Sequence, residues 1–118
     1  MPKLQNNKNI PLEEEEQKAL VQWLRFKNIK HTSVPNSTYT KSWSQKAKNK
    51  AMGLCPGLPD LVVCLPDVLL FVEMKRKGNK PTPEQVDWID RLNTYGSVKA
   101  VVCYSFEEAA ENITKYSN

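Results

Sequence analysis

The chain has 118 residues, of which 40% are hydrophobic and 25% charged, as expected for one soluble globular domain. Its three cysteines form no Cys-X-X-Cys pair and are accompanied by a single histidine, which argues against a zinc site, and no apolar run is long enough to span a membrane. The net charge of +4 favours a polyanionic partner.

The N-terminal quarter of the chain divides into a polar segment and a helix. Residues 1–10 are rich in Asn and Lys and lack the apolar core of a signal peptide, so we expect them to be disordered or extended and the protein to be cytoplasmic. A single domain is expected over residues 11–118. Four glutamates followed by an apolar stripe predict a helix over residues 11–26, because acidic side chains stabilise the positive end of the helix dipole.

The middle of the chain combines a long polar loop with a β-hairpin. A short strand is expected at residues 31–34, followed by a loop at residues 36–57 in which residues 44–52 form a short helical piece. Two apolar runs, residues 61–65 and 68–72, flank a Pro-Asp turn. This arrangement predicts two antiparallel strands joined by a tight turn.

Two capping boxes predict the helices of the last third. Residues 82–85, Thr-Pro-Glu-Gln, begin a helix that we expect to end at Gly96, and residues 105–108, Ser-Phe-Glu-Glu, begin the final helix. The apolar run at residues 98–104 predicts a buried strand between them. Because strand, helix and strand follow one another here, this strand should be parallel to the second hairpin strand. The expected fold class is α/β, with a small mixed β-sheet flanked by helices.

Three side chains of complementary chemistry should meet at one end of the predicted hairpin. Asp60 precedes the first strand, while Glu73 and Lys75 lie at the end of the second, two residues apart and therefore on the same side. The two carboxylates and the Met74 backbone carbonyl offer the oxygen ligands that Mg²⁺ and Mn²⁺ prefer. The Lys75 side chain can orient an attacking water as an ammonium or deprotonate it as a neutral amine. This set of groups suits metal-assisted hydrolysis of a phosphodiester.

Basic residues lie on both sides of this motif. They could form an ordinary solvated surface, but their position beside a carboxylate site favours contact with a phosphate backbone. Trp43 and Tyr39, in the same polar loop, are candidates for stacking on exposed bases. The residues expected to bind DNA are Asn36, which could also simply form a turn, Lys46, Lys48, Lys50, Arg76 and Lys77.

Several of these residues resemble a known signature. Pro59-Asp60 and Glu73-Met74-Lys75 resemble the paired motif of the PD-(D/E)xK nuclease superfamily, and their surroundings resemble its VRR-NUC (virus-type replication-repair nuclease) family. The resemblance covers residues 12 to about 111. It includes the first helix, the Val-Pro-Asn sequence after the first strand, the glycine-flanked entry to the hairpin and the Pro-Glu-Gln sequence that begins the next helix.

The resemblance implies a restriction-endonuclease-like core and a nuclease that depends on Mg²⁺ or Mn²⁺. It assigns catalysis to Asp60, Glu73 and Lys75, with Gln85 assisting and Glu13 completing an acidic metal-binding cluster. Small stand-alone members of viral or prophage origin resemble structure-selective enzymes that cut branched DNA such as Holliday junctions, often as homodimers. The expected function is therefore a structure-selective DNA endonuclease of phage replication, recombination or repair.

Some alternatives stay open at this point. Glu13 continues the inward stripe of the first helix better than Glu14 or Glu16, although it could serve only the helix dipole. Gln85 would be selected by the capping box even without a role in catalysis. For the whole chain, the alternatives are an exonuclease or flap nuclease, and a non-catalytic DNA-binding module that keeps the fold.

Overall fold

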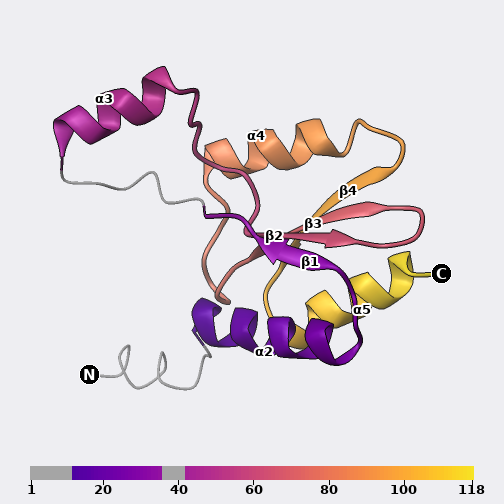
Figure 1. The fold of residues 1–118 in the computed structure, drawn as a ribbon. Helices are drawn as coiled ribbons and strands as arrows, with labels where there is room; N and C mark the ends of the chain where they lie inside the picture. The colour runs from indigo at the N-terminus through magenta and orange to yellow at the C-terminus, as the bar shows by residue number, and fades with distance from the viewer. Residues whose placement is uncertain (1–11, 36–41) are drawn as a thin grey trace, which may run out of the picture.

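The computed structural model describes residues 12–35 and 42–118 as a β-sheet with helices on both faces (Figure 1). The polar N-terminal segment, Asn36 and Tyr39, for which predictions were made above, lie outside these residues. In chain order the elements are α2 (Glu13–Phe26), β1 (His31–Ser33), α3 (Trp43–Ala51), β2 (Leu61–Cys64), β3 (Leu69–Met74), α4 (Pro83–Leu92), β4 (Val98–Cys103) and α5 (Phe106–Tyr116). Each of these elements was predicted from the sequence to within a few residues, except that α4, the first helix of the last third, ends at Leu92, before Gly96.

The sheet is mixed, as predicted, and its strand order is β1-β2-β3-β4. β2 and β3 form the antiparallel hairpin, in which Leu61 pairs with Val72 and Cys64 with Leu69. β4 runs parallel to β3, and α4 provides the connection between them. β1 adds an antiparallel strand at the edge beside β2. This topology places the beginning of β2 and the end of β3 at the same end of the sheet.

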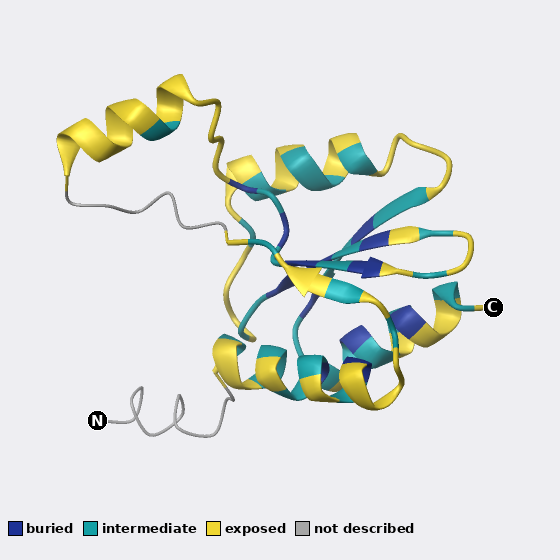
Figure 2. Ribbon diagram, in the orientation of Figure 1, coloured by how far each residue is buried: buried dark blue, intermediate teal, exposed yellow. Residues whose placement is uncertain are grey.

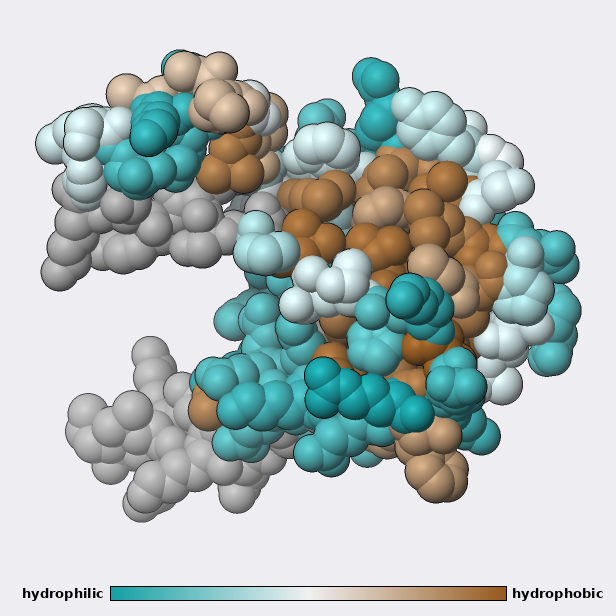
Figure 3. Space-filling view, viewed as in Figure 1, coloured by the Kyte–Doolittle hydropathy of each residue, from teal (hydrophilic) through white to brown (hydrophobic). Residues whose placement is uncertain are grey.

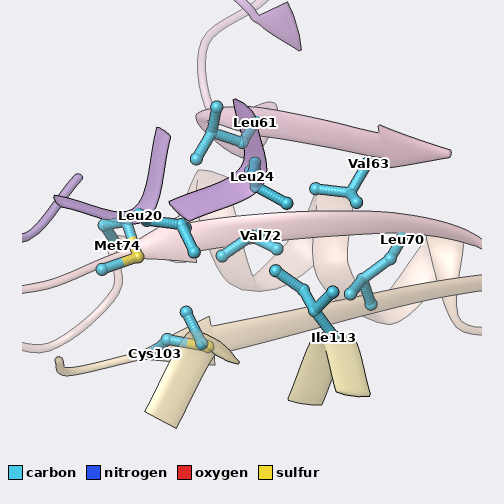
Figure 4. Close-up of a cluster of buried hydrophobic side chains, with 10 residues drawn as sticks. Leu20, Leu24, Leu61, Val63, Leu70, Val72, Met74, Cys103 and Ile113 are labelled. Atoms are coloured by element: carbon cyan, nitrogen blue, oxygen red, sulfur yellow. The ribbon is translucent and has the colours of Figure 1, made fainter. Parts of the chain in front are cut away.

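The main core lies between the sheet and the helices α2 and α5 (Figure 4). Alternate residues of β2 and β3 point to this face, which is the arrangement that the period of two in a strand requires. The helices close the core with leucine, alanine and isoleucine side chains at helical spacing. The fully buried residues are Leu20, Leu24, Leu61, Val63, Leu70, Val72, Met74, Cys103, Ala109 and Ile113.

Helix α4 covers the other face of the sheet and packs mainly against β4. Its start is set by the predicted capping box, in which the Thr82 hydroxyl accepts from the Gln85 N–H at 3.2 Å and the Gln85 side-chain oxygen accepts from the Thr82 N–H at 2.9 Å. The loop before β2 packs against this helix, because the Trp88 indole N–H donates to the Pro56 carbonyl at 3.1 Å. Gly57 is buried at this contact and has a positive φ of 107°.

Helix α3 differs from the others in that it projects from the body of the protein and has no buried residue (Figures 1 and 2). Its first turn is capped by Ser42, whose hydroxyl accepts from the Gln45 N–H at 3.2 Å. No helix among the described residues is long and apolar enough to cross a membrane.

Candidate active site

Three carboxylates from separate segments meet at the end of the sheet. Glu13 begins α2, Asp60 directly precedes β2, and Glu73 lies near the end of β3. One oxygen of each lies within 4.8 Å of the others. The site residues that the sequence predicted to converge are therefore neighbours in the structure. Carboxylates this close repel one another unless a proton or a cation lies among them.

The backbone of β3 helps to place Asp60. The Met74 N–H donates to Oδ2 of Asp60 at 3.0 Å, while the Asp60 carbonyl accepts from the Val34 N–H at 2.8 Å. The predicted role of Met74 was to offer its carbonyl to a metal. The contact that the structure records is made by its N–H, which orients a carboxylate of the cluster, and the carbonyl role stays a prediction.

Glu73 is the most buried member of the cluster, with only 1% of the residue exposed. Its Oε2 accepts from the Gln85 side-chain amide at 3.0 Å and lies 3.8 Å from the Lys75 ammonium. Its Oε1 is buried without a hydrogen-bond partner among the described residues. Leaving a buried acceptor unsatisfied costs about 1–3 kcal/mol, so this oxygen fits a role as a metal ligand better than a structural one.

The pKa values of all three carboxyl groups of the cluster are raised, chiefly by burial. Burial, followed by the negative charge of Asp60, raises the pKa of Glu73 to about 8, although Lys75 opposes the shift. Burial also raises the pKa of Asp60, against the Met74 N–H, which stabilises the charged form. Burial raises the pKa of Glu13 as well, and Lys75 opposes it. The metal-free cluster therefore holds a proton near neutral pH, and a divalent cation can take its place.

The Gln85 side chain performs two tasks at once. Because its oxygen accepts from the Thr82 N–H in the capping box, its nitrogen is directed at Glu73. The sequence left open whether Gln85 serves the cap or the site, and the structure shows contacts for both. The start of α4 thus holds one buried carboxylate oxygen in place.

The four glutamates at the start of α2 have different surroundings. Glu13 joins the cluster, where the Arg76 backbone N–H also donates to it. Glu14 forms an exposed ion pair with Lys18 at 3.1 Å. The Oε1 of Glu16 accepts from the Phe106 N–H at 2.9 Å and so caps the first turn of α5. The choice of Glu13 over its neighbours for the cluster agrees with this geometry, whereas the contact of Glu16 was not predicted.

The basic residues expected to bind DNA fall into two groups. Arg76 and Lys77 follow Lys75 directly in the loop after β3, where Arg76 is half-buried and Lys77 exposed. Lys46, Lys48 and Lys50 all lie on α3 and are exposed. Asn36 lies outside the described residues.

Comparisons with known proteins agree on one family. The family model of the VRR-NUC domain matches residues 3–107. A solved structure of a VRR_NUC domain protein has a TM-score of 0.69 and 25% sequence identity, covering 92% of this chain and 89% of that chain. A second solved structure, of a VRR_NUC domain, has a TM-score of 0.61 and 27% sequence identity. The match covers 88% of this chain and 96% of that chain. The comparison with curated proteins gave no match.

Proposed function

The chain belongs to the VRR-NUC family of nuclease-type domains, and from this premise we propose that it is a DNA endonuclease dependent on Mg²⁺ or Mn²⁺. The observation that carries the proposal is the buried Oε1 of Glu73, which lacks a hydrogen-bond partner among the described residues and lies within a cluster of three carboxylates. A protein that only binds DNA gains nothing from acidic groups at the phosphate backbone, because they repel it.

Each group of the cluster has a chemical role in this proposal. Glu13, Asp60, Glu73 and the Met74 carbonyl would hold the metal ion, since hard divalent cations prefer oxygen ligands. When bound, the ion supplies a water of lowered pKa and neutralises charge on the scissile phosphate. Lys75, of which 13% of the side chain is exposed, directs its ammonium into the site and can hydrogen-bond the attacking water or a phosphate oxygen.

The remaining predicted roles concern the substrate. We assign phosphate contacts to Asn36, Lys46, Lys48, Lys50, Arg76 and Lys77, because they are polar or cationic and flank the cluster in the sequence. The family resemblance supports selectivity for branched DNA, including junctions, in phage replication, recombination or repair. Net charge and the basic loop after β3 support binding to a polyanion of this kind.

A homodimer is part of the proposal, because one small domain offers one cluster and two strands of a symmetric junction must be cut. Exposed apolar side chains on the face of the sheet that carries α4 support a homodimer. Val62 and Phe71 pair across the hairpin on this side and are only half-buried, and Leu69 beyond them is 37% exposed. Figure 3 shows hydrophobic side chains gathered on the face of the molecule between α4 and α2. An apolar patch of this kind suits contact with a second copy.

A cleavage assay tests the enzymatic part of the proposal. Four-way junction, flap, single-stranded and paired duplex DNA are incubated with Mg²⁺ or Mn²⁺, and we expect cutting that EDTA abolishes. Asp60→Asn should reduce the rate by at least 10³-fold, on the order of the loss expected when a metal ligand is neutralised. Asp67→Asn is the matched control, because Asp67 is an exposed carboxylate in the turn at the other end of the same hairpin.

The pattern of products separates the alternatives. Release of single nucleotides from ends, or cutting of flaps alone, would indicate the exonuclease or flap nuclease. Binding of junction DNA without cleavage in either metal would indicate the non-catalytic module.

A further inference from the structure

Helix α3 is the described element whose role is least explained by the fold. It has nine residues, none of them buried, and it projects from the body of the protein (Figures 1 and 2). A helix of this length is only marginally stable in water without tertiary contacts. Its sequence therefore has to be explained by something outside the domain core.

The first residue of α3 is an exposed tryptophan. Trp43 is 82% exposed, and the Lys46 ammonium lies 4.9 Å from the centre of its ring. An indole offers a large flat surface that is costly to leave in water and that a nucleobase can cover. The lysine held beside the ring places a positive charge where the phosphate of a stacked nucleotide would follow.

The three lysines of α3 do not share one face. With 3.6 residues per turn, Lys46 and Lys50 are one turn apart and lie on the stripe that contains Trp43. Lys48 lies about half a turn away from both, on the other side of the helix. One face of α3 thus combines an aromatic ring with two cations, and α3 contains no acidic residue.

The position of α3 relative to the acidic cluster completes the argument. Figure 1 shows α3 on the same side of the molecule as the beginning of α2, which carries Glu13. A DNA strand whose phosphate lies at the cluster and that runs along this side of the molecule can therefore reach α3.

We propose that Trp43 stacks on an unpaired base of the DNA substrate while Lys46 and Lys50 bind the adjoining phosphates, so that α3 selects DNA containing unpaired bases near the cleavage site. The proposal rests on the function proposed above and assigns its structure selectivity to one element. DNA is favoured over a second copy of the chain as the occupant of this face. A second copy carries the same net charge of +4, whereas DNA offers uniform negative charge and flat bases.

The test compares binding to two DNA probes in EDTA, so that nothing is cut. The probes are a fully paired duplex and the same duplex with a central unpaired stretch, and fluorescence anisotropy gives the affinities. Trp43→Ala should weaken binding to the unpaired probe about 5- to 150-fold, the change that corresponds to about 1–3 kcal/mol for one stacked base. Binding to the paired probe should change less than twofold, and Trp43→Phe should keep most of the affinity for the unpaired probe.

Four further variants sharpen the test. Met52→Ala removes an 81% exposed apolar side chain just after α3 that has no aromatic ring, and it should leave both affinities unchanged. Lys46→Gln and Lys50→Gln should each reduce the slope of log affinity against log salt by about 0.7–0.9, whereas Lys48→Gln should have a smaller effect.

Two results would overturn the inference, and a third would separate it from the proposed nuclease function. Equal losses on both probes for Trp43→Ala would show that the ring makes no contact specific to unpaired bases. Sedimentation of Trp43→Ala as a monomer, where the wild type is a dimer, would assign α3 to contact with a second copy. If the probes are discriminated as expected but no DNA is cut with Mg²⁺ or Mn²⁺, the stacking role stands and the proposed nuclease function fails.

Discussion

Replacing Glu73 with glutamine should show how much the acidic cluster destabilises the metal-free protein and whether the cluster binds a divalent cation. The side chain is almost completely buried, and burial together with Asp60 raises its pKa to about 8. Glutamine has nearly the same shape but carries no charge. Its side-chain oxygen can still accept from the Gln85 amide, which lies 3.0 Å from Oε2 in the wild type. The change therefore removes an ionisable group and a proposed metal ligand without creating a cavity.

The sign of the pH effect follows from the direction of the shift. Between the ordinary pKa of 4.5 and about 8, folded Glu73 keeps a proton that the unfolded chain has released. Its contribution to stability is therefore fully present below pH 4.5 and is lost as the pH rises through 8. A difference of one proton corresponds to a slope of at most about 1.4 kcal/mol per pH unit in the metal-free protein. The raised pKa values of Asp60 and Glu13 act in the same direction.

The assay is urea denaturation in EDTA at a series of pH values from 5 to 8. We expect the free energy of unfolding of the wild type to fall toward pH 8 and that of Glu73→Gln to fall much less, so that the variant is more stable at pH 8. Added Mn²⁺ should stabilise the wild type and have little effect on the variant. Glu111→Gln, at an exposed position of α5, is the control and should keep the wild-type slope. Parallel slopes for wild type and Glu73→Gln would refute the electrostatic argument.

Two further predictions concern stability rather than metal binding. Gly57→Ala should lower the free energy of unfolding by about 2–4 kcal/mol, because the added Cβ would lie 2.6 Å from a backbone oxygen of α4 at a residue with positive φ. Gly53→Ala is the control and should cost only about 1 kcal/mol, because Gly53 has a φ of 92° and open space around it. Equal losses for the two variants in urea denaturation would contradict the packing argument. Glu16→Ala removes the acceptor for the Phe106 N–H and should cost about 1–2 kcal/mol while leaving Mn²⁺ affinity, measured by calorimetry, unchanged.

The hairpin shows why part of the site could be predicted from local sequence. A Pro-Asp turn between two apolar runs requires antiparallel pairing, and that pairing places Asp60 and the end of β3 at one end of the sheet. The alternation of side chains along β3 then orients Glu73 and Lys75 together. Only short-range geometry is involved, so the convergence of these three residues followed from the sequence.

Contacts between segments that are distant in the chain could not be predicted from local sequence. The bond from Gln85 to Glu73 depends on how α4 lies across the sheet, and the capping box alone could not reveal its second partner. The role of Glu16 depends on the packing of α5 beside α2, since its partner is ninety residues away in the chain. Local sequence likewise predicted a short helix near α3, but it could not show that this helix would project from the domain.

The sequence by itself determined the order of the elements, the mixed sheet and the set of groups able to hold a divalent cation, because turns, caps and side-chain periodicity are properties of neighbouring residues. The sequence favoured Glu13 among four adjacent glutamates, and the structure places this residue in the cluster. Only the tertiary structure decided which oxygen of Glu73 lacks a donor among the described residues and that α3 projects from the body of the protein. Those outcomes depend on the angles and distances at which α2, α4 and the sheet pack. Packing of this kind is set by the whole core and by no single stretch of residues.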